Sequence, residues 1–246
     1  MNLIIDEGNS FSKIAVYEFD NITYFKIADT KNICTIIEKL LKTRKIQKAI
    51  YSSVIKNNER AISILNNNLD TIIFNFSVPV PIKINYLTPQ TLGLDRLAGV
   101  IGANNLFPKQ NILVIDAGTC IKYDFINNNS EYQGGSISPG LQIRFKSLNT
   151  FTEKLPLIKS DFEIDYIIGN NTMNSLLSGV INGISFEING FINYYKDLYE
   201  NLKIFCTGGD MIYFDKRIKN SIFANPNLIL WGLNVILNYN AEKNNI

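Results

Sequence analysis

Two short segments built around an aspartate and a glycine are the parts of this chain best suited to chemistry. Asp6-Glu7-Gly8-Asn9 and Asp116-Ala117-Gly118-Thr119 each follow an apolar run and precede a second, β-rich run. A glycine in such a turn lets the backbone approach a ligand closely, and Asn9 and Ser10 add donors for phosphate oxygens. An aspartate at the end of a strand can hold a hydrated divalent cation. One copy alone is typical of an ordinary hairpin turn, but its recurrence favours a ligand site.

Gly93-Leu94-Asp95-Arg96 is a third candidate segment, because it opens an apolar helical stretch. There the Asp95 carboxylate could accept a hydroxyl proton while the Arg96 guanidinium pairs with a carboxylate or a phosphate. Phosphoryl transfer suits a weak base of this kind, since positioning matters more than proton abstraction. Asp95 could equally do no more than begin or cap the helix, as aspartates commonly do. The residues alone leave these two interpretations open.

The composition excludes several classes of site. The chain of 246 residues has no histidine, which excludes a Ser-His-Asp triad, an HExxH zinc site and an imidazole base. Any acid–base chemistry must therefore use a carboxylate, a lysine, a tyrosine or a cysteine. The P-loop motif is absent, which excludes a P-loop kinase, and the absence of GxGxxG leaves a Rossmann dinucleotide site unsupported.

Charge and cysteine content limit the possible binding partners and the cellular compartment. With 24 basic and 22 acidic residues the net charge is +2, which provides no electrostatic case for nucleic acid or an anionic membrane as a partner. The three cysteines are far apart, so we expect neither a disulfide framework nor a zinc site, and we expect a cytoplasmic location. We expect no signal peptide, and the apolar stretches are too short to span a bilayer.

The elements that must position these residues form an internal repeat. Residues 3–25 and 113–135 both run as a strand, an Asp-x-Gly turn, a second strand, a polar turn and a third strand. Helical stripes and further strands follow each copy, including a long amphipathic helix through residues 176–192. A repeat of this length indicates duplicated domains. We therefore expect an α/β protein with a domain at 1–107, a similar domain at 108–246, and Asp6 and Asp116 facing each other across a cleft.

The order of the motifs resembles a known family. The Asp6, Gly93 and Asp116 segments, followed by the glycine-rich block 134–140, resemble the type III pantothenate kinases, which belong to the acetate kinase, sugar kinase, Hsp70 and actin superfamily. The resemblance extends from Asn2 to about Gly232. It implies mixed sheets with flanking helices of the ribonuclease H-like, actin and sugar-kinase type. It also implies ATP-dependent phosphorylation of pantothenate to 4'-phosphopantothenate, the first step of coenzyme A biosynthesis, by a homodimer.

The same resemblance implies a role for each motif residue. Asp95 would be the catalytic proton acceptor, Asp6 would lie near magnesium, and Asp116 would bind a monovalent cation, potassium or ammonium. The residues implied to bind ATP are Asp6, Glu7, Gly8, Asn9, Ser10, Phe11, Ser12, Lys13 and Thr119. The residues implied to bind pantothenate are Tyr86, Gly93, Leu94, Asp95, Arg96 and Thr172. Thr172 could instead be an N-terminal helix cap, and Tyr86 could be a core residue.

Two positions depart from the family pattern, and two other functions stay open. Lys122 stands where family members usually carry a small polar residue, so it could repel potassium or supply the positive charge itself. Glu7 occupies a place that is normally apolar. A non-catalytic accessory transcriptional regulator would keep the fold and lose the chemistry, and a kinase for another small alcohol would keep both. Retention of Asp6, Asp95, Arg96 and Asp116 favours an enzyme.

Overall fold

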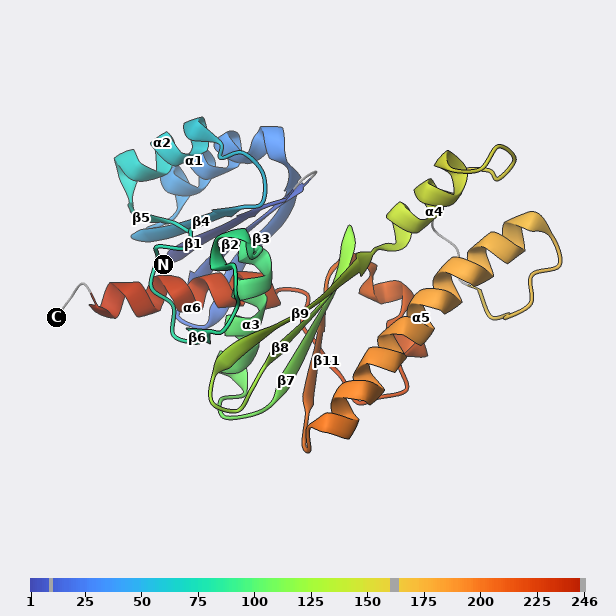
Figure 1. Cartoon of the computed structure of the whole chain (residues 1–246). Helices are drawn as coiled ribbons and strands as arrows, with labels where there is room; N and C mark the ends of the chain where they lie inside the picture. Colours follow the sequence, from blue (N-terminus) through green and yellow to red (C-terminus); the bar gives the residue numbers. More distant parts are fainter. Residues whose placement is uncertain (9–10, 160–163, 244–246) are drawn as a thin grey trace. The chain divides into compact units, whose positions relative to one another are not determined.

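The computed structural model describes residues 1–8, 11–159 and 164–243 (Figure 1). Asn9 and Ser10, both expected to bind ATP, lie outside the described residues. The chain divides into two compact units. Unit 1 comprises Met1–Pro108, Ser130–Tyr132 and Asn227–Ile246, and unit 2 comprises Lys109–Asn129 and Gln133–Pro226. Each unit has a mixed sheet with helices, so the expected α/β class is confirmed.

The sheet of unit 1 has the strand order β3-β2-β1-β4-β5. Its strands are β1 (Asn2–Glu7), β2 (Phe11–Glu18), β3 (Asn21–Asp29), β4 (Lys48–Ser53) and β5 (Asp70–Ile73). The first three form an antiparallel meander, and β4 and β5 continue the sheet in parallel with β1. A short strand β6 (Lys83–Ile84) pairs with residues 131–132. The helical turns η1 (Thr30–Asn32) and η2 (Pro89–Thr91) connect these elements.

Helices cover both faces of this sheet (Figure 1). Helix α1 (Ile33–Thr43) and helix α2 (Glu59–Asn68) bury their apolar stripes on one face, with Ile33, Ile37 and Leu65 fully or almost fully buried. Helix α6 (Leu228–Lys243) contacts β1 and β4 on the other face, and it packs along α3 (Leu94–Leu106). The sheet of unit 1 is therefore covered by helices on both faces.

The C-terminal helix belongs to unit 1, which differs from the expected single cut after residue 107. The physical reason is close backbone packing between α3 and α6. A Cβ atom at Gly232 would lie 1.8 Å from the carbonyl oxygen of Ala98, and one at Gly102 would lie 2.6 Å from that of Leu228. The indole N–H of Trp231 donates a hydrogen bond of 3.1 Å to Asn105 Oδ1. These contacts return the end of the chain to the first unit.

Unit 2 repeats the strand arrangement of unit 1. Its order β11-β10-β7-β8-β9 places an antiparallel β8 on one side of β7 and a parallel β10 on the other, as β2 and β4 flank β1. The strands are β7 (Ile112–Ala117), β8 (Cys120–Ile126), β9 (Glu131–Pro139), β10 (Lys203–Thr207) and β11 (Phe223–Ala224). The duplication expected from the sequence is thus present in both sheets.

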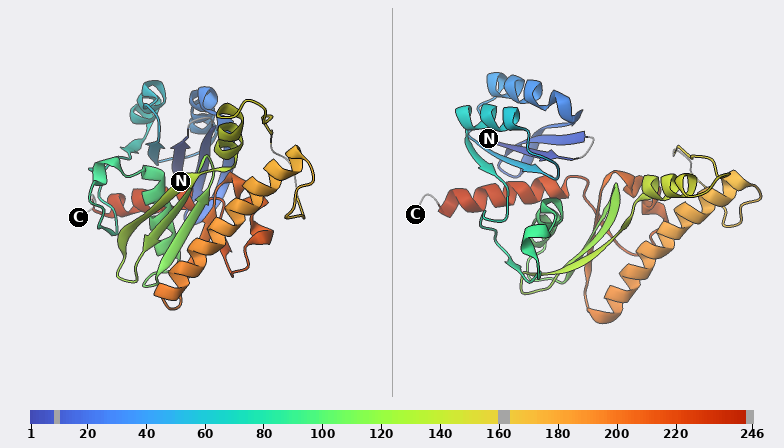
Figure 2. Two further views of the ribbon diagram at one scale, coloured as in Figure 1. Left: turned by 45° about the vertical axis from the view of Figure 1, so that its right-hand side comes forward. Right: turned by 45° about the horizontal axis from the view of Figure 1, so that its top comes forward.

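Two helices complete the core of unit 2 (Figure 2). Helix α5 (Thr172–Leu198) lies along the sheet and includes the amphipathic stretch expected at 176–192, with Ile184, Ile188 and Ile192 fully buried. Helix α4 (Leu141–Thr150) packs against α5, and the turns η3 (Gly209–Tyr213) and η4 (Asp215–Arg217) follow β10. Within the described part of the chain, no helix has the length and apolarity to cross a membrane.

Candidate functional site

Each unit places a lysine and a hydroxyl beside the aspartate of its Asp-x-Gly turn. In unit 1, Asp6 on β1 is in register with Lys13 on β2 and with Ser52 on β4. In unit 2, Asp116 on β7 is in register with Lys122 on β8 and with Thr207 on β10. Because register partners on neighbouring strands project to the same face of a sheet, the three side chains of each set lie together. We call these sets the Asp6 triad and the Asp116 triad.

The hydroxyl of each triad is buried and unpartnered. Ser52 is 1% exposed and Thr207 is 2% exposed, and neither hydroxyl has a hydrogen-bond partner among the residues that the structure describes. Leaving such a group unsatisfied costs about 1–3 kcal/mol, so proteins rarely tolerate it without a bound water, ion or ligand. The unpartnered hydroxyls therefore mark both triads as candidate ligand sites. Sequence reasoning missed Ser52, because it lies in neither Asp-x-Gly segment. Thr207 opens the glycine-rich segment Thr207-Gly208-Gly209-Asp210, which from the sequence could be either a nucleotide-binding segment or a plain turn after a strand.

The residues around Asp6 divide between the two faces of the sheet. Adjacent residues on a strand point to opposite faces, so Glu7 points away from the Asp6 triad. The Glu7 carboxylate is 1% exposed and accepts a hydrogen bond from the Tyr51 hydroxyl, which accepts one of 3.0 Å from the Asn58 N–H. Burial, together with the hydrogen bond to Glu7, raises the pKa of Tyr51 to about 12. The Glu7 side chain is thus a core group, and the Glu7 carbonyl oxygen accepts a hydrogen bond of 3.1 Å from the Val54 N–H.

The other residues expected to bind ATP differ in exposure. In unit 1, Phe11 is exposed and Lys13 is half-buried. Ser12 is buried, with its hydroxyl 3.3 Å from that of Thr30. Thr119 of unit 2 is exposed in the turn between β7 and β8.

The Asp116 triad contains an ion pair. Lys122 Nζ lies 2.7 Å from Asp116 Oδ2, and the two side chains are only 19% and 15% exposed. The backbone of Gly208 closes over the same carboxylate with a φ of +98°, and a Cβ atom there would lie 2.6 Å from Asp116 Oδ1. Asp210 in η3 interacts with the Asp116 carboxylate. Burial, and to a smaller extent the negative charge of Asp116, raises the pKa of Asp210 to about 6.

The start of α3 brings together most residues expected to bind pantothenate. Gly93 is the N-cap, and Asp95 Oδ1 accepts a hydrogen bond of 2.9 Å from the Arg96 N–H in the first turn. The Arg96 side chain is 7% exposed, and its guanidinium carbon lies 5.9 Å from the centre of the Tyr86 ring. Tyr86 in turn lies 6.0 Å from the buried ring of Tyr132. A carboxylate, a buried cation and an aromatic ring therefore meet within unit 1.

Thr172 is separate from this group in the chain and in its unit. It is the first residue of α5 in unit 2 and is exposed. The alternative interpretation of Thr172 as a helix cap is wrong, because Asn171 is the N-cap and its side chain accepts a hydrogen bond of 2.9 Å from the Asn174 N–H.

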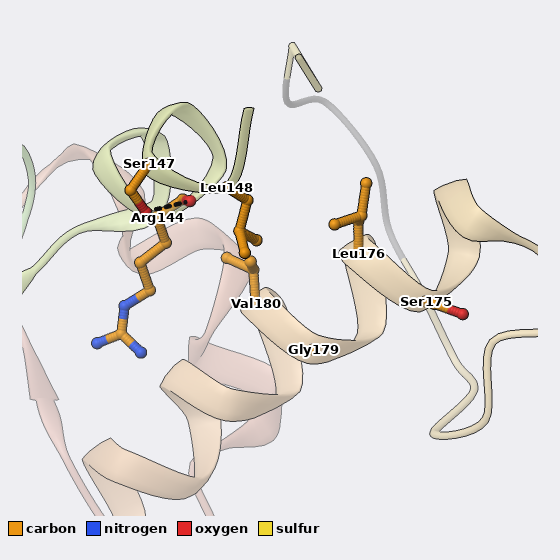
Figure 3. Close-up of a pocket in the computed structure, with 7 residues that line it drawn as sticks. All are labelled: Arg144, Ser147, Leu148, Ser175, Leu176, Gly179 and Val180. Atoms are coloured by element: carbon orange, nitrogen blue, oxygen red, sulfur yellow. Dashed lines mark hydrogen bonds between the residues drawn. The ribbon is translucent and has the colours of Figure 1, made fainter. Parts of the chain in front are cut away.

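A hollow of about 480 Å³ lies between α4 and α5 (Figure 3). In Figure 3 the side chains of Leu148 and Val180 point toward each other across it, while Arg144 extends away. The lining is Arg144, Ser147, Leu148, Ser175, Leu176, Gly179 and Val180. None of the residues expected to bind ATP or pantothenate lines it, so we do not assign the chemistry to this hollow.

Comparison with known families decides what the motifs belong to. A family model described as type III pantothenate kinase matches residues 2–194. The chain belongs to the type III pantothenate kinase family. A type III pantothenate kinase of Phocaeicola vulgatus is 42% identical, over 98% of this chain and 100% of that protein. A type III pantothenate kinase of Christiangramia forsetii is 43% identical, over 99% of this chain and 100% of that protein. Membership of the type III pantothenate kinase family confirms the resemblance that the motifs indicated.

Solved structures of similar fold include a sugar kinase. A Campylobacter jejuni protein named as a Baf family transcriptional activator is 24% identical with a TM-score of 0.61, over 98% of this chain and 99% of that one. A glucokinase from an Antarctic psychrotroph is 12% identical with a TM-score of 0.52, over 97% of this chain and 98% of that one. At these identities the likeness concerns the fold alone.

Proposed function

We propose that this protein transfers the γ-phosphoryl group of ATP to the primary hydroxyl of pantothenate. The product is 4'-phosphopantothenate, and the reaction opens coenzyme A biosynthesis. The observation that carries the proposal is the meeting of Asp95, Arg96 and Tyr86 at the start of α3, in a chain of the type III pantothenate kinase family.

Pantothenate has a hydroxyl at one end and a carboxylate at the other, and the α3 group matches both. Asp95 would hold the hydroxyl and take its proton as the phosphoryl group leaves ATP. The Arg96 guanidinium would pair with the substrate carboxylate, which it can do through two parallel hydrogen bonds. Gly93 and Leu94 would contact pantothenate through the backbone at the helix start, and the Tyr86 ring would form a wall.

The ATP phosphates would be bound in unit 1 by the turn that begins at Asp6, through backbone groups and Lys13. A magnesium ion is normally held by one or two carboxylates together with substrate phosphates, and it neutralises charge that develops during transfer. The Asp6 carboxylate and the unpartnered Ser52 hydroxyl supply oxygen atoms that fit such an ion. The described residues include no cluster of three or more histidine, cysteine or acidic side chains that could hold a metal alone.

We also propose a cytoplasmic homodimer. Helix α5 carries several exposed apolar side chains, among them Phe186 at 65% and Tyr194 at 63% exposure. An interface formed along this helix would cover these side chains, and Thr172 begins the same helix. Light scattering at micromolar concentration tests this proposal, and a monomer would count against it.

A direct assay tests the proposed reaction. Purified protein is incubated with ATP, magnesium and pantothenate, and the product is identified by mass spectrometry. Panthenol, which has the same primary hydroxyl and no carboxylate, serves as the matched substrate. Preference for pantothenate supports the role of Arg96, whereas equal use of both would favour a kinase for other small alcohols. No phosphorylation of either would favour the accessory regulator of the same fold.

A further inference from the structure

The Asp116 carboxylate already has a cationic partner from its own chain. Lys122 Nζ lies 2.7 Å from Asp116 Oδ2, a typical distance for a charge-assisted hydrogen bond. The two residues are register partners in the antiparallel β7–β8 pair, so a strand rather than a loop delivers the ammonium group. Both side chains are largely buried, which protects the pair from screening by salt.

The residues present do not fit a bound monovalent cation at this position. Potassium and ammonium need oxygen ligands, and Asp116 and the unpartnered Thr207 hydroxyl would provide them. The third neighbour, however, is a lysine ammonium, which repels a second positive charge across a few ångströms in a partly buried site. The cation that the family resemblance implies would therefore compete with Lys122 for the same carboxylate.

We propose that the Lys122 ammonium replaces the monovalent cation, so that the enzyme needs neither potassium nor added ammonium. This inference rests on the proposed kinase function. A side-chain cation differs from a bound ion in one measurable way, because its local concentration does not depend on the medium. Activity is then independent of potassium, whereas a bound ion would make activity rise and saturate with potassium concentration.

The residues around Lys122 indicate that its removal would create a potassium site. Asp116 and Asp210 interact electrostatically, and Thr207 adds the unpartnered hydroxyl. Lys122→Thr would remove the positive charge and add a hydroxyl to the oxygen groups of Asp116, Asp210 and Thr207. Such a set suits a potassium ion. We therefore expect the substitution to create a dependence on potassium that the natural protein lacks.

Steady-state rates test the inference. The assay uses ATP, magnesium and pantothenate in buffers free of potassium and ammonium, with tetramethylammonium chloride holding the ionic strength at about 0.1 M. The rate of the natural protein should change by less than about twofold when potassium replaces tetramethylammonium, because the ionic strength is constant and Lys122 already pairs with Asp116. Without potassium, the rate of Lys122→Thr should be about 10²-fold lower than that of the natural protein, which is the usual effect of removing one charge-stabilising group. Added potassium should restore most of the lost rate.

A binding measurement keeps the test informative if the variant turns over poorly. A ligand that binds only the folded state raises the unfolding midpoint, so potassium should raise the midpoint of Lys122→Thr and leave that of the natural protein unchanged. Lys122→Arg keeps the charge and should stay independent of potassium. Lys83→Thr is the matched control, because it removes a lysine from another cross-strand ion pair, 2.8 Å from Glu131, that lies on the surface.

The outcomes separate this inference from the proposed function. A natural protein that phosphorylates pantothenate only when potassium or ammonium is added keeps the function and overturns the inference. A Lys122→Thr variant that folds, stays inactive at every potassium concentration and shows no midpoint shift also overturns it, and points to direct contact between Lys122 and ATP. Absence of phosphorylation by the natural protein under all conditions overturns the function itself.

Discussion

The guanidinium carbon of Arg96 lies 5.9 Å from the centre of the Tyr86 ring. A cation over an aromatic face gains electrostatic attraction, which helps to hold this nearly buried charge in one orientation. The arrangement joins the first turn of α3 to the segment after β6, both within unit 1. It holds the Arg96 guanidinium in a fixed position beside Asp95 in unit 1.

Replacing Arg96 should weaken pantothenate binding selectively. A hydrogen bond to a charged group contributes about 1.5–3 kcal/mol, so Arg96→Met should raise KM for pantothenate by roughly 10- to 10²-fold. KM for ATP should change little, and the use of panthenol should change less than that of pantothenate. Arg96→Lys keeps the charge but loses the pair of parallel hydrogen bonds. Its KM for pantothenate should therefore lie between those of the natural protein and of Arg96→Met. Equal losses for both substrates would contradict the carboxylate pairing.

Asp95→Asn should slow turnover without harming the fold. Asparagine retains an oxygen that can accept the hydrogen bond from the Arg96 N–H, but it carries no negative charge. We expect kcat to fall by about 10²-fold or more, the scale of a positioned general base, with KM for ATP little changed. Asp20→Asn, in the exposed turn between β2 and β3, is the control for loss of an acidic charge. A wild-type rate for Asp95→Asn would reduce Asp95 to a structural residue.

Gly93→Ala tests the position of the Asp95 carboxylate rather than its charge. A Cβ atom at residue 93 would lie 2.6 Å from Asp95 Oδ1, and the carboxylate can relieve this clash by turning aside. The substitution should therefore lower kcat by about tenfold or more, since small misplacements of reacting groups are costly, and leave the unfolding midpoint nearly unchanged. Gly183→Ala on α5 meets no atom within 4 Å and should leave kcat unaffected. An unchanged rate for Gly93→Ala would show that the carboxylate position does not matter.

Gly232→Ala should destabilise unit 1. Its Cβ atom would lie 1.8 Å from the Ala98 carbonyl oxygen, and neither α3 nor α6 can move away without losing the packing of the other. We expect a loss of about 2 kcal/mol or more in the free energy of unfolding, measured by urea titration. Gly183→Ala is again the comparison, because alanine is favoured over glycine in an open helical position. Equal stability of the two variants would contradict the close contact.

Glu187 should contribute acid-sensitive stability to unit 2. Burial acts to raise its pKa, but the hydrogen bonds from neighbouring side chains outweigh burial and hold the pKa below its ordinary value. The donors are Ser138, Arg144 and Tyr123. A depressed carboxyl pKa adds stability above the unfolded value of about 4.3, and this stability is lost as pH falls through the folded value.

The test measures the unfolding midpoints of the natural protein and of two variants at pH 7 and at lower pH. Glu187→Gln should lower the midpoint at pH 7 and flatten its decline below about pH 4.5, where the natural protein loses the charged contacts. Glu153→Gln, at an exposed position, should follow the natural protein at every pH. Parallel curves for Glu187→Gln and the natural protein would show that the cluster carries no pH-dependent stability.

Most of the candidate site could be predicted from local patterns. The strand that ends after Asp6, the Asp116 turn, the long helix through residues 176–192 and the helix start at Gly93 all appear in the structure where the sequence indicated them. Each of these signals depends on residues that are close in the chain, such as an apolar period or a glycine after an aspartate. The family resemblance rested on the same motifs and is confirmed by family membership.

The sequence by itself determined the duplicated Asp-x-Gly turns, the α3 motif and the α/β class, because periodicity and turn chemistry are local properties. Only the tertiary structure decided that Ser52 and Thr207 stand beside the two aspartates, that Lys122 rather than solvent faces Asp116, and that the Glu7 side chain is buried. It also assigned α6 to unit 1. These facts depend on which strands and helices become neighbours, and that choice comes from burial and backbone pairing between segments far apart in the chain.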